Sequence, residues 1–191
     1  MIAGNLEYLI NSLPDLAFRH DKEVQERVEY LLQTYAGHQS EQDDLVSFFV
    51  GEAIKFLSDR EAEQLQIINL QSIHESRFQD SRIRLVREYA EFIYAFKGSL
   101  ATYRMARRDS TTQHSSAKHT PIKQGTPLEE EVQVLQIQWE KLEELASGHH
   151  YDLEALIIYK LHLEILQRYW SFDEGKGMDI FKSITEKTEH G

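Results

Sequence analysis

The chain has 191 residues, of which 21 are Lys or Arg and 32 are Asp or Glu, so its formal net charge at pH 7 is −11. This balance argues against a nucleic-acid partner, because affinity for nucleic acid depends on clustered cations that contact phosphates. The sequence contains no cysteine, which excludes disulfides, thiolate nucleophiles and cysteine-ligated metal sites and fits a cytoplasmic protein.

The N-terminal part of the chain predicts helices and no membrane insertion. Asn5 and Glu7 interrupt the apolar residues at the start, so no signal peptide is expected, and no stretch approaches the roughly 20 apolar residues that span a bilayer. Helices are predicted over 5–13, 21–35 and 60–74. A further helix opens after two aspartates that can cap it and carries five apolar residues, Leu45, Phe48, Phe49, Phe56 and Leu57.

The middle of the chain predicts one long helix followed by a linker. Apolar residues recur over 76–108 at alternating steps of three and four, which is typical of a helical seam: Val86, Tyr89, Ile93, Phe96, Leu100 and Tyr103. Residues 109–127 are rich in Ser, Thr and His and have little to bury. We therefore expect a flexible internal linker over 109–127 within a single helical domain of residues 1–191.

The C-terminal part restarts with a capping box formed by Thr126 and Glu129, and its apolar seam runs from Leu128 to Ala146. Gly148 is placed to end this helix, and Asp152 to cap the next one, over 153–169, which should be the most buried. A last amphipathic helix is expected over 177–187. These patterns predict an all-α fold, a bundle of about six to seven helices with two long seam helices on either side of the linker. The seams either pack against each other or leave part of one for a partner's helix.

The turn between the last two long helices contains His149, His150 and Asp152, which could belong to a metal site or to the turn itself. Adjacent histidines normally point apart, and a zinc site needs a further ligand. His162 is ten residues into the next helix and about 15 Å along its axis. We therefore favour turn formation, capping and surface packing, with a partner contact as the alternative.

Motifs for enzymatic chemistry are missing. No histidine follows a glutamate at the Glu-x-x-His spacing of di-iron helical bundles, and His74–Glu75 does not extend to His-Glu-x-x-His because Phe78 occupies the last position. Gly175–Gly177 lacks the rest of a phosphate-binding loop. We expect no catalytic, cofactor-binding or metal-binding residues, although a helical enzyme that assembles its site from distant residues is a third hypothesis.

The charge is unevenly distributed. Residues 76–108 hold eight Lys or Arg and three Asp or Glu, a net +5, whereas 127–191 hold six and fourteen, a net −8. The basic helix either presents a solvated face that pairs with acidic neighbours or docks an acidic partner. The arginines considered for this face are Arg82, Arg84, Arg87, Arg104, Arg107 and Arg108.

Several segments together resemble an uncharacterised bacterial family whose genes travel with those of V/A-type ATPases. That family is similar to the central-stalk subunit of the ATPase, called C or d, a helical funnel seated on the membrane ring. The segments are 5–16 (NLEYLINSLPDL), 104–108 (RMARR), 139–145 (WEKLEEL), 152–157 (DLEALI) and 166–170 (LQRYW).

This resemblance implies a non-catalytic accessory or central-stalk-like component of a rotary ATPase, with rotor-shaft or membrane-ring subunits as partners. Such a protein is cytoplasmic, or held at the inner face of the membrane through a protein complex. Two groups of residues become candidate partner contacts: Arg104, Arg107 and Arg108, and His149, His150 and Asp152. The alternative is a general helical adaptor or self-associating regulator unrelated to an ATPase.

Overall fold

The computed structural model describes residues 6–36, 45–108 and 122–172. Within these ranges the chain forms eight α-helices and a short 3-10 turn and contains no β-strand, so the predicted all-α fold class is confirmed. The elements are α1 (Leu6–Ser12), α2 (Lys22–Ala36), α3 (Leu45–Ala53), η1 (Ile54–Phe56), α4 (Asp59–Ile67), α5 (Ser76–Gln79), α6 (Arg84–Arg108), α7 (Pro127–Leu145) and α8 (Leu153–Trp170).

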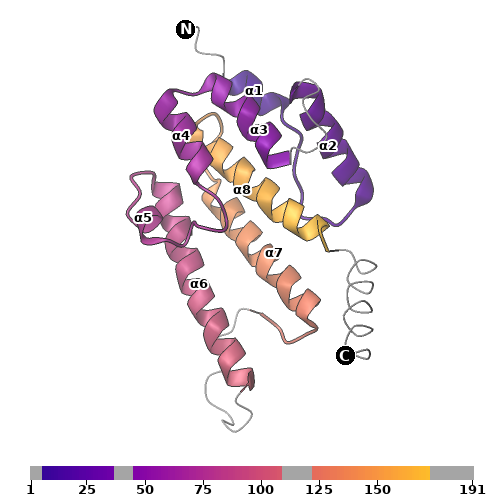
Figure 1. Ribbon diagram of the computed structural model, residues 1–191, viewed down its shortest axis with the longest axis vertical. Coiled ribbons are helices and arrows are strands. Elements are labelled where there is room, and N and C mark those ends of the chain that lie inside the picture. Colours follow the sequence, from indigo (N-terminus) through magenta and orange to yellow (C-terminus); the bar gives the residue numbers. More distant parts are fainter. Residues whose placement is uncertain (1–5, 37–44, 109–121, 173–191) are drawn as a thin grey trace, which may run out of the picture.

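Helix α8 lies at the centre of the molecule (Figure 1) and packs against α3, α4 and α7. It runs antiparallel to α7, and α6 packs along the other side of α7. Helices α1, α3 and α4 lie near the first half of α8, α2 packs against α3, and α6 and α7 extend away from this group. None of the helices within the described ranges is both long and apolar enough to cross a bilayer.

The buried residues are concentrated around the central helix α8. Half of the residues of α8 are buried, which confirms that it is the most buried helix, and they form one core with residues from α1 to α7. A second, smaller cluster joins the far ends of the two seam helices through Phe96, Leu100, Ile122 and Val134. The seams of α6 and α7 therefore pack against each other within the fold, which is the first of the two alternatives, except that Leu128 at the start of α7 is exposed.

The local signals at the ends of α7 and α8 are confirmed. Thr126 and Glu129 form the predicted capping box at the start of α7, and the side chain of Asp152 accepts a hydrogen bond from the amide of Ala155 at the start of α8. Gly148 has a φ of 93° in the turn between them, a value that L side chains rarely adopt. Each of these features depends only on residues a few positions away in the sequence.

Three helix bounds differ from the prediction. The helix predicted over 76–108 is two helices, α5 and α6, because Asp80 leaves the helical conformation and the hydroxyl of Ser81 accepts a hydrogen bond from the amide of Ile83. The α-helix predicted to carry Phe56 and Leu57 ends at Ala53 and continues as the 3-10 turn η1. The helix predicted over 60–74 ends at Ile67.

The early end of α4 is fixed by a distant side chain. Lys160 of α8 is only 4% exposed, and its Nζ donates hydrogen bonds to the carbonyl oxygens of Leu65, Gln66 and Ile68 at 2.8, 3.2 and 2.6 Å. The last carbonyls of a helix have no intrahelical partner. An ammonium group at this end therefore satisfies them and also interacts favourably with the negative end of the helix dipole. Lys160 is thus a buried C-terminal cap for α4.

The expected linker over 109–127 falls largely on residues outside the described part of the chain, as does the helix expected over 177–187. From Ile122 onward the segment is packed. Ile122 is 5% exposed, and the amide and carbonyl of Lys123 both bond the side-chain amide of Gln133, at 2.7 and 3.0 Å. The last residues of the expected linker, 122–126, are therefore part of the folded structure.

A buried histidine lies beside the core tryptophan. His162 is 6% exposed and stacks on Trp139 with ring centroids 3.8 Å apart. Its Nε2 atom has no hydrogen-bond partner among the described residues, and the nearest carboxylate, Glu143, is 3.6 Å away and mostly exposed. Burial lowers the pKa of His162 from 6.5 to about 4, although a backbone hydrogen bond at Trp139 acts in the opposite direction.

This histidine should make the fold sensitive to acid. Because the native state disfavours the protonated form, its contribution is complete above pH 6.5 and is lost as the pH falls towards about 4. We expect about 3 kcal/mol of unfolding free energy to be lost over that interval in the wild type but not in His162→Phe. Urea denaturation followed by circular dichroism across this pH range measures the difference.

Exposed His150 provides the control, since His150→Phe should keep the wild-type pH dependence. Parallel stability curves for the wild type and His162→Phe would show that the buried imidazole is not the group responsible.

Candidate functional site

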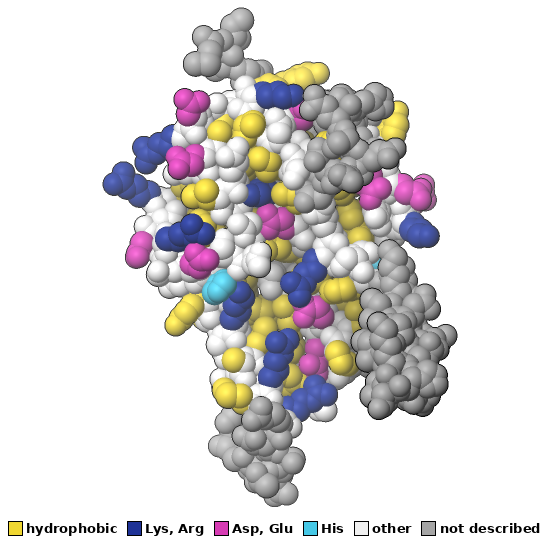
Figure 2. Space-filling view, in the orientation of Figure 1, with side chains coloured by type: hydrophobic (Ala, Val, Ile, Leu, Met, Phe, Trp, Pro, Cys, Tyr) yellow, Lys and Arg dark blue, Asp and Glu magenta, His cyan; other side chains and the backbone are white. Residues whose placement is uncertain are grey.

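A groove with a volume of about 690 Å³ opens between α6 on one side and α7 and α8 on the other. Figure 2 shows this face, where basic and acidic side chains lie close to exposed hydrophobic ones below the middle of the view. The turn after α4 closes one end of the groove through Leu70 and Gln71. The helices contribute the remaining residues: Phe96, Lys97, Leu100, Arg104, Glu131, Val134, Leu135, Gln138, Glu164, Gln167 and Arg168.

Both carboxylates that line the groove are engaged within the fold. Glu131 Oε1 lies 2.5 Å from Nη2 of Arg168. Glu164 Oε2 accepts a hydrogen bond of 2.7 Å from the amide of Leu70, and its other oxygen is 3.8 Å from Nζ of Lys160. The negative charge of the groove is therefore balanced by neighbouring groups of the same chain.

The two cations on the α6 side have no such balance. Lys97 Nζ lies 2.9 Å from Nδ1 of His74, and Arg104 has no hydrogen-bond or ion-pair partner among the described residues. Burial, together with the positive charge of Arg168, lowers the pKa of Lys97. The groove thus combines an apolar floor with two positive charges that no carboxylate in the described residues neutralises.

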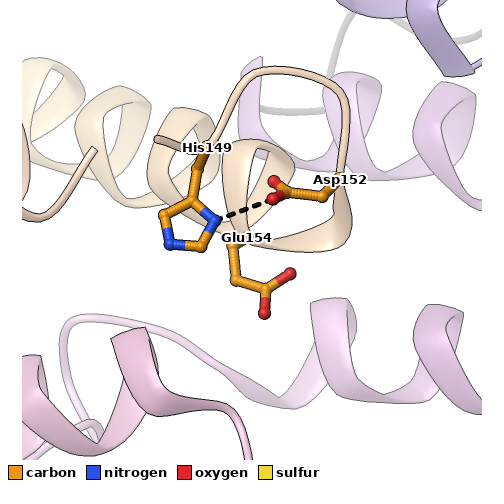
Figure 3. A group of neighbouring side chains, drawn as sticks. All are labelled: His149, Asp152 and Glu154. Carbon is orange, nitrogen blue, oxygen red and sulfur yellow. Dashed lines mark hydrogen bonds and ion pairs between the residues drawn. The ribbon is translucent and has the colours of Figure 1, made fainter. Parts of the chain in front are cut away.

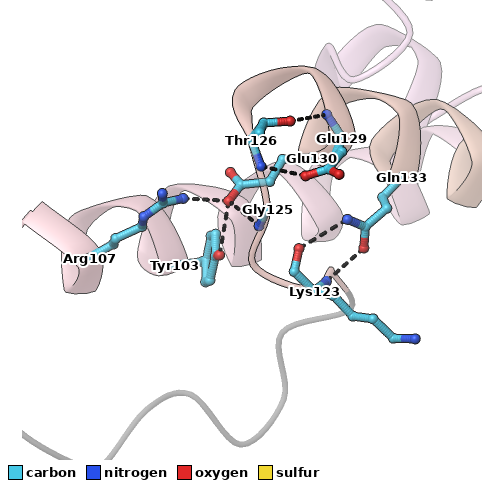
Figure 4. A network of polar contacts seen from close by, with 8 residues as sticks. All are labelled: Tyr103, Arg107, Lys123, Gly125, Thr126, Glu129, Glu130 and Gln133. Atoms are coloured by element: carbon cyan, nitrogen blue, oxygen red, sulfur yellow. Dashed lines mark hydrogen bonds and ion pairs between the residues drawn. The ribbon is translucent and has the colours of Figure 1, made fainter.

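Arg107 has a different role from Arg104, although both belong to the basic helix. Its guanidinium pairs with the buried carboxylate of Glu130, which also accepts hydrogen bonds of 3.3 Å from Tyr103 and from the amide of Gly125 (Figure 4). Burial raises the pKa of Glu130, but the bond from Gly125 and the charge of Arg107 outweigh it and hold that pKa below its usual value. Arg107 therefore fastens α6 to the start of α7.

The remaining arginines considered for the basic face also differ in whether they have a partner within the fold. Arg84 pairs with Glu88 one turn away, and Arg87 donates to the carbonyl of Ser81. Arg82 is exposed, and the side chain of Arg108 is outside the described part of the structure. Of the two proposed contact arginines whose side chains the structure describes, Arg104 lines the groove and Arg107 does not.

The second group of candidates lies in the turn between α7 and α8. His149 Nδ1 is 2.7 Å from Asp152 Oδ2, while Oδ1 of Asp152 accepts the amide of Ala155 (Figure 3). Glu154 brings a third side chain near, and the potential ligand atoms of the three residues lie within 4.8 Å of one another. Both oxygens of Asp152 already have partners that form the turn and cap α8, so we assign the cluster to that structural role.

The two groups of candidates do not form one surface. Arg107 contacts the beginning of α7, whereas His149 follows its end, and a helix of 19 residues is about 28 Å long. His150 is exposed beside Tyr151, with ring centroids 6.5 Å apart. A partner that contacts both groups would have to extend along the whole of α7.

Most residues that line the groove were not predicted from the sequence. Lys97 and Arg104 are seven residues apart, a spacing that places both on one face of α6 and could have been read as a pair. Glu131 and Arg168 carried no local signal, because they meet only when α7 packs beside α8.

The C-terminal part of the chain matches a known family model. Residues 117–191 match the model described as "Protein of unknown function (DUF2764)", which includes α7 and α8. No curated protein and no solved structure matches the chain. The groove is lined by residues from inside and outside the matched region. Glu131 and Arg168 belong to the matched residues, whereas Lys97 and Arg104 precede them.

The packing of residues 122–126 can be tested with trypsin, which cleaves after Lys123. Gln133→Ala removes both hydrogen bonds to the backbone of Lys123, and two bonds of about 1 kcal/mol each should make local opening at least about tenfold more frequent. We expect cleavage after Lys123 to accelerate by a similar factor, as measured by mass spectrometry of the fragments.

Gln136→Ala on the same helix is the matched control, because Gln136 bonds only Glu140 among the described residues and does not contact this segment. Equal cleavage rates for the two variants would contradict a backbone clamp at Gln133.

Proposed function

We propose that this chain is a non-catalytic helical component that binds other proteins of a V/A-type rotary ATPase through the groove between α6, α7 and α8. The observation that carries the proposal of protein binding is the pair of uncompensated cations, Lys97 and Arg104, beside an apolar floor. Such a surface combines desolvation of apolar area with charge that orients the partner.

The assignment to a rotary ATPase rests on the resemblance of the segments quoted above. Three of them, 139–145, 152–157 and 166–170, lie in α7 and α8 or at their caps and contribute to the hydrophobic core, and the last of them also lines the groove through Gln167 and Arg168. An all-helical body suits a component that must transmit force, because interlocked helices deform little. The proposed partners are subunits of the rotor shaft or the membrane ring.

A general adaptor or self-associating regulator is the second candidate function, and the same groove supports it. The two hypotheses differ in the identity of the partner. Sedimentation of the purified chain alone tests self-association, and binding to purified ATPase tests the first hypothesis.

The direct test is retention of solubilised V/A-type ATPase from the native cell on the immobilised full chain. Reversing both uncompensated charges, Lys97→Glu with Arg104→Glu, should reduce retention of shaft or ring subunits at least about tenfold at low ionic strength. Both residues are exposed, and the double reversal removes one contact, that of Lys97 with His74, so the fold should be retained. Immunoblotting for each subunit gives the measurement.

Arg82→Glu is the matched control, because Arg82 belongs to the same basic region, is exposed and does not line the groove. It should retain the subunits as the wild type does. Failure of the wild-type chain to retain any ATPase subunit would contradict the ATPase assignment.

A further inference from the structure

We infer that the groove accepts an amphipathic helix of another protein that carries two carboxylates two turns apart, flanking apolar side chains. This inference rests on the proposed function as far as protein binding is concerned and names the chemistry of the partner. It follows from the spacing of the cations, the composition of the floor and the positions of the amide side chains.

The spacing comes from α6 itself. Lys97 and Arg104 are seven residues apart, which corresponds to two helical turns and about 10 Å along the axis. Carboxylates at positions i and i+7 of a partner helix repeat at the same distance on one face. A helix lying roughly parallel or antiparallel to α6 can therefore place one carboxylate near each cation.

The surface between the cations is apolar. Leu100 lies midway between Lys97 and Arg104 on α6 and packs in one cluster with Val134 of α7, so both belong to the floor of the groove. A partner helix with carboxylates at i and i+7 presents its i+3 and i+4 positions between them, where Leu or Ile side chains would enter the groove. Burial of such side chains supplies affinity, while the charges fix register and direction.

The other lining groups agree with a protein ligand. Gln138 and Gln167 offer both donors and acceptors at the edge of the groove. Glu131 and Glu164 are each already paired within the fold, so a partner with isolated carboxylates meets Lys97 and Arg104 as the uncompensated charges.

Fluorescence anisotropy with designed peptides tests the inference. The acidic peptide is a labelled alanine-rich helix with Glu at i and i+7 and Leu at i+3 and i+4, and the basic peptide differs only in carrying Lys at the two Glu positions. We expect the full-length wild type to bind the acidic peptide at least about tenfold more tightly, and added salt to reduce the preference.

The double variant Lys97→Glu with Arg104→Glu should invert this preference and bind the basic peptide more tightly. Such an inversion cannot arise from misfolding, because a misfolded chain would lose both peptides. Arg82→Glu should keep the wild-type preference. Equal binding of the two peptides by the wild type, or no inversion in the double variant, would overturn the inference.

A second copy of the chain is the competing occupant. A wild-type dimer that the double reversal dissociates, together with a lack of binding to either peptide, would assign the groove to self-association and overturn the inference. The peptide and ATPase experiments can fail independently. If the peptide preference inverts but the wild type retains no ATPase subunit, the ATPase assignment alone is rejected. If the double variant retains the subunits as well as the wild type does, the groove is rejected as the contact.

Discussion

A single buried ammonium group connects the central helix to the segment that precedes the basic helix. Lys160 of α8 donates to three carbonyl oxygens at the end of α4, and Glu164, one turn later, accepts the amide of Leu70. These contacts join residues more than 90 positions apart in the sequence. Because polar groups buried without partners destabilise a fold, the pairing fixes both where α4 ends and how the following turn lies on α8.

The same contacts shape the groove. Leu70 and Gln71 close one end of it, so the turn that Lys160 and Glu164 hold in place also limits where a ligand can lie. Glu164 is committed to this turn and Glu131 to Arg168, which leaves Lys97 and Arg104 as the charges of the groove that no carboxylate of the described residues neutralises. The acidic chain therefore presents a local positive site because its nearby carboxylates have structural roles.

The features that could be predicted from the sequence are those determined by neighbouring residues. The capping box at Thr126 and Glu129, the cap at Asp152 and the left-handed Gly148 depend on a few adjacent positions, and the apolar seams depend on helical periodicity. The break between α5 and α6 was missed because the seam of α6 was extended back across it. The role of Lys160 and the pairing of Glu131 with Arg168 could not be predicted, since they arise only when distant helices pack together.

The free energy of unfolding of Lys160→Met tests the central claim most directly. Met preserves the length and most of the volume of the side chain but leaves the carbonyls of Leu65, Gln66 and Ile68 without their donor. Our account predicts a loss of about 3 kcal/mol in urea denaturation at neutral pH, compared with less than about 1 kcal/mol for Lys55→Met, which removes an exposed lysine that pairs with Glu52. Equal stability of the two variants would contradict the account.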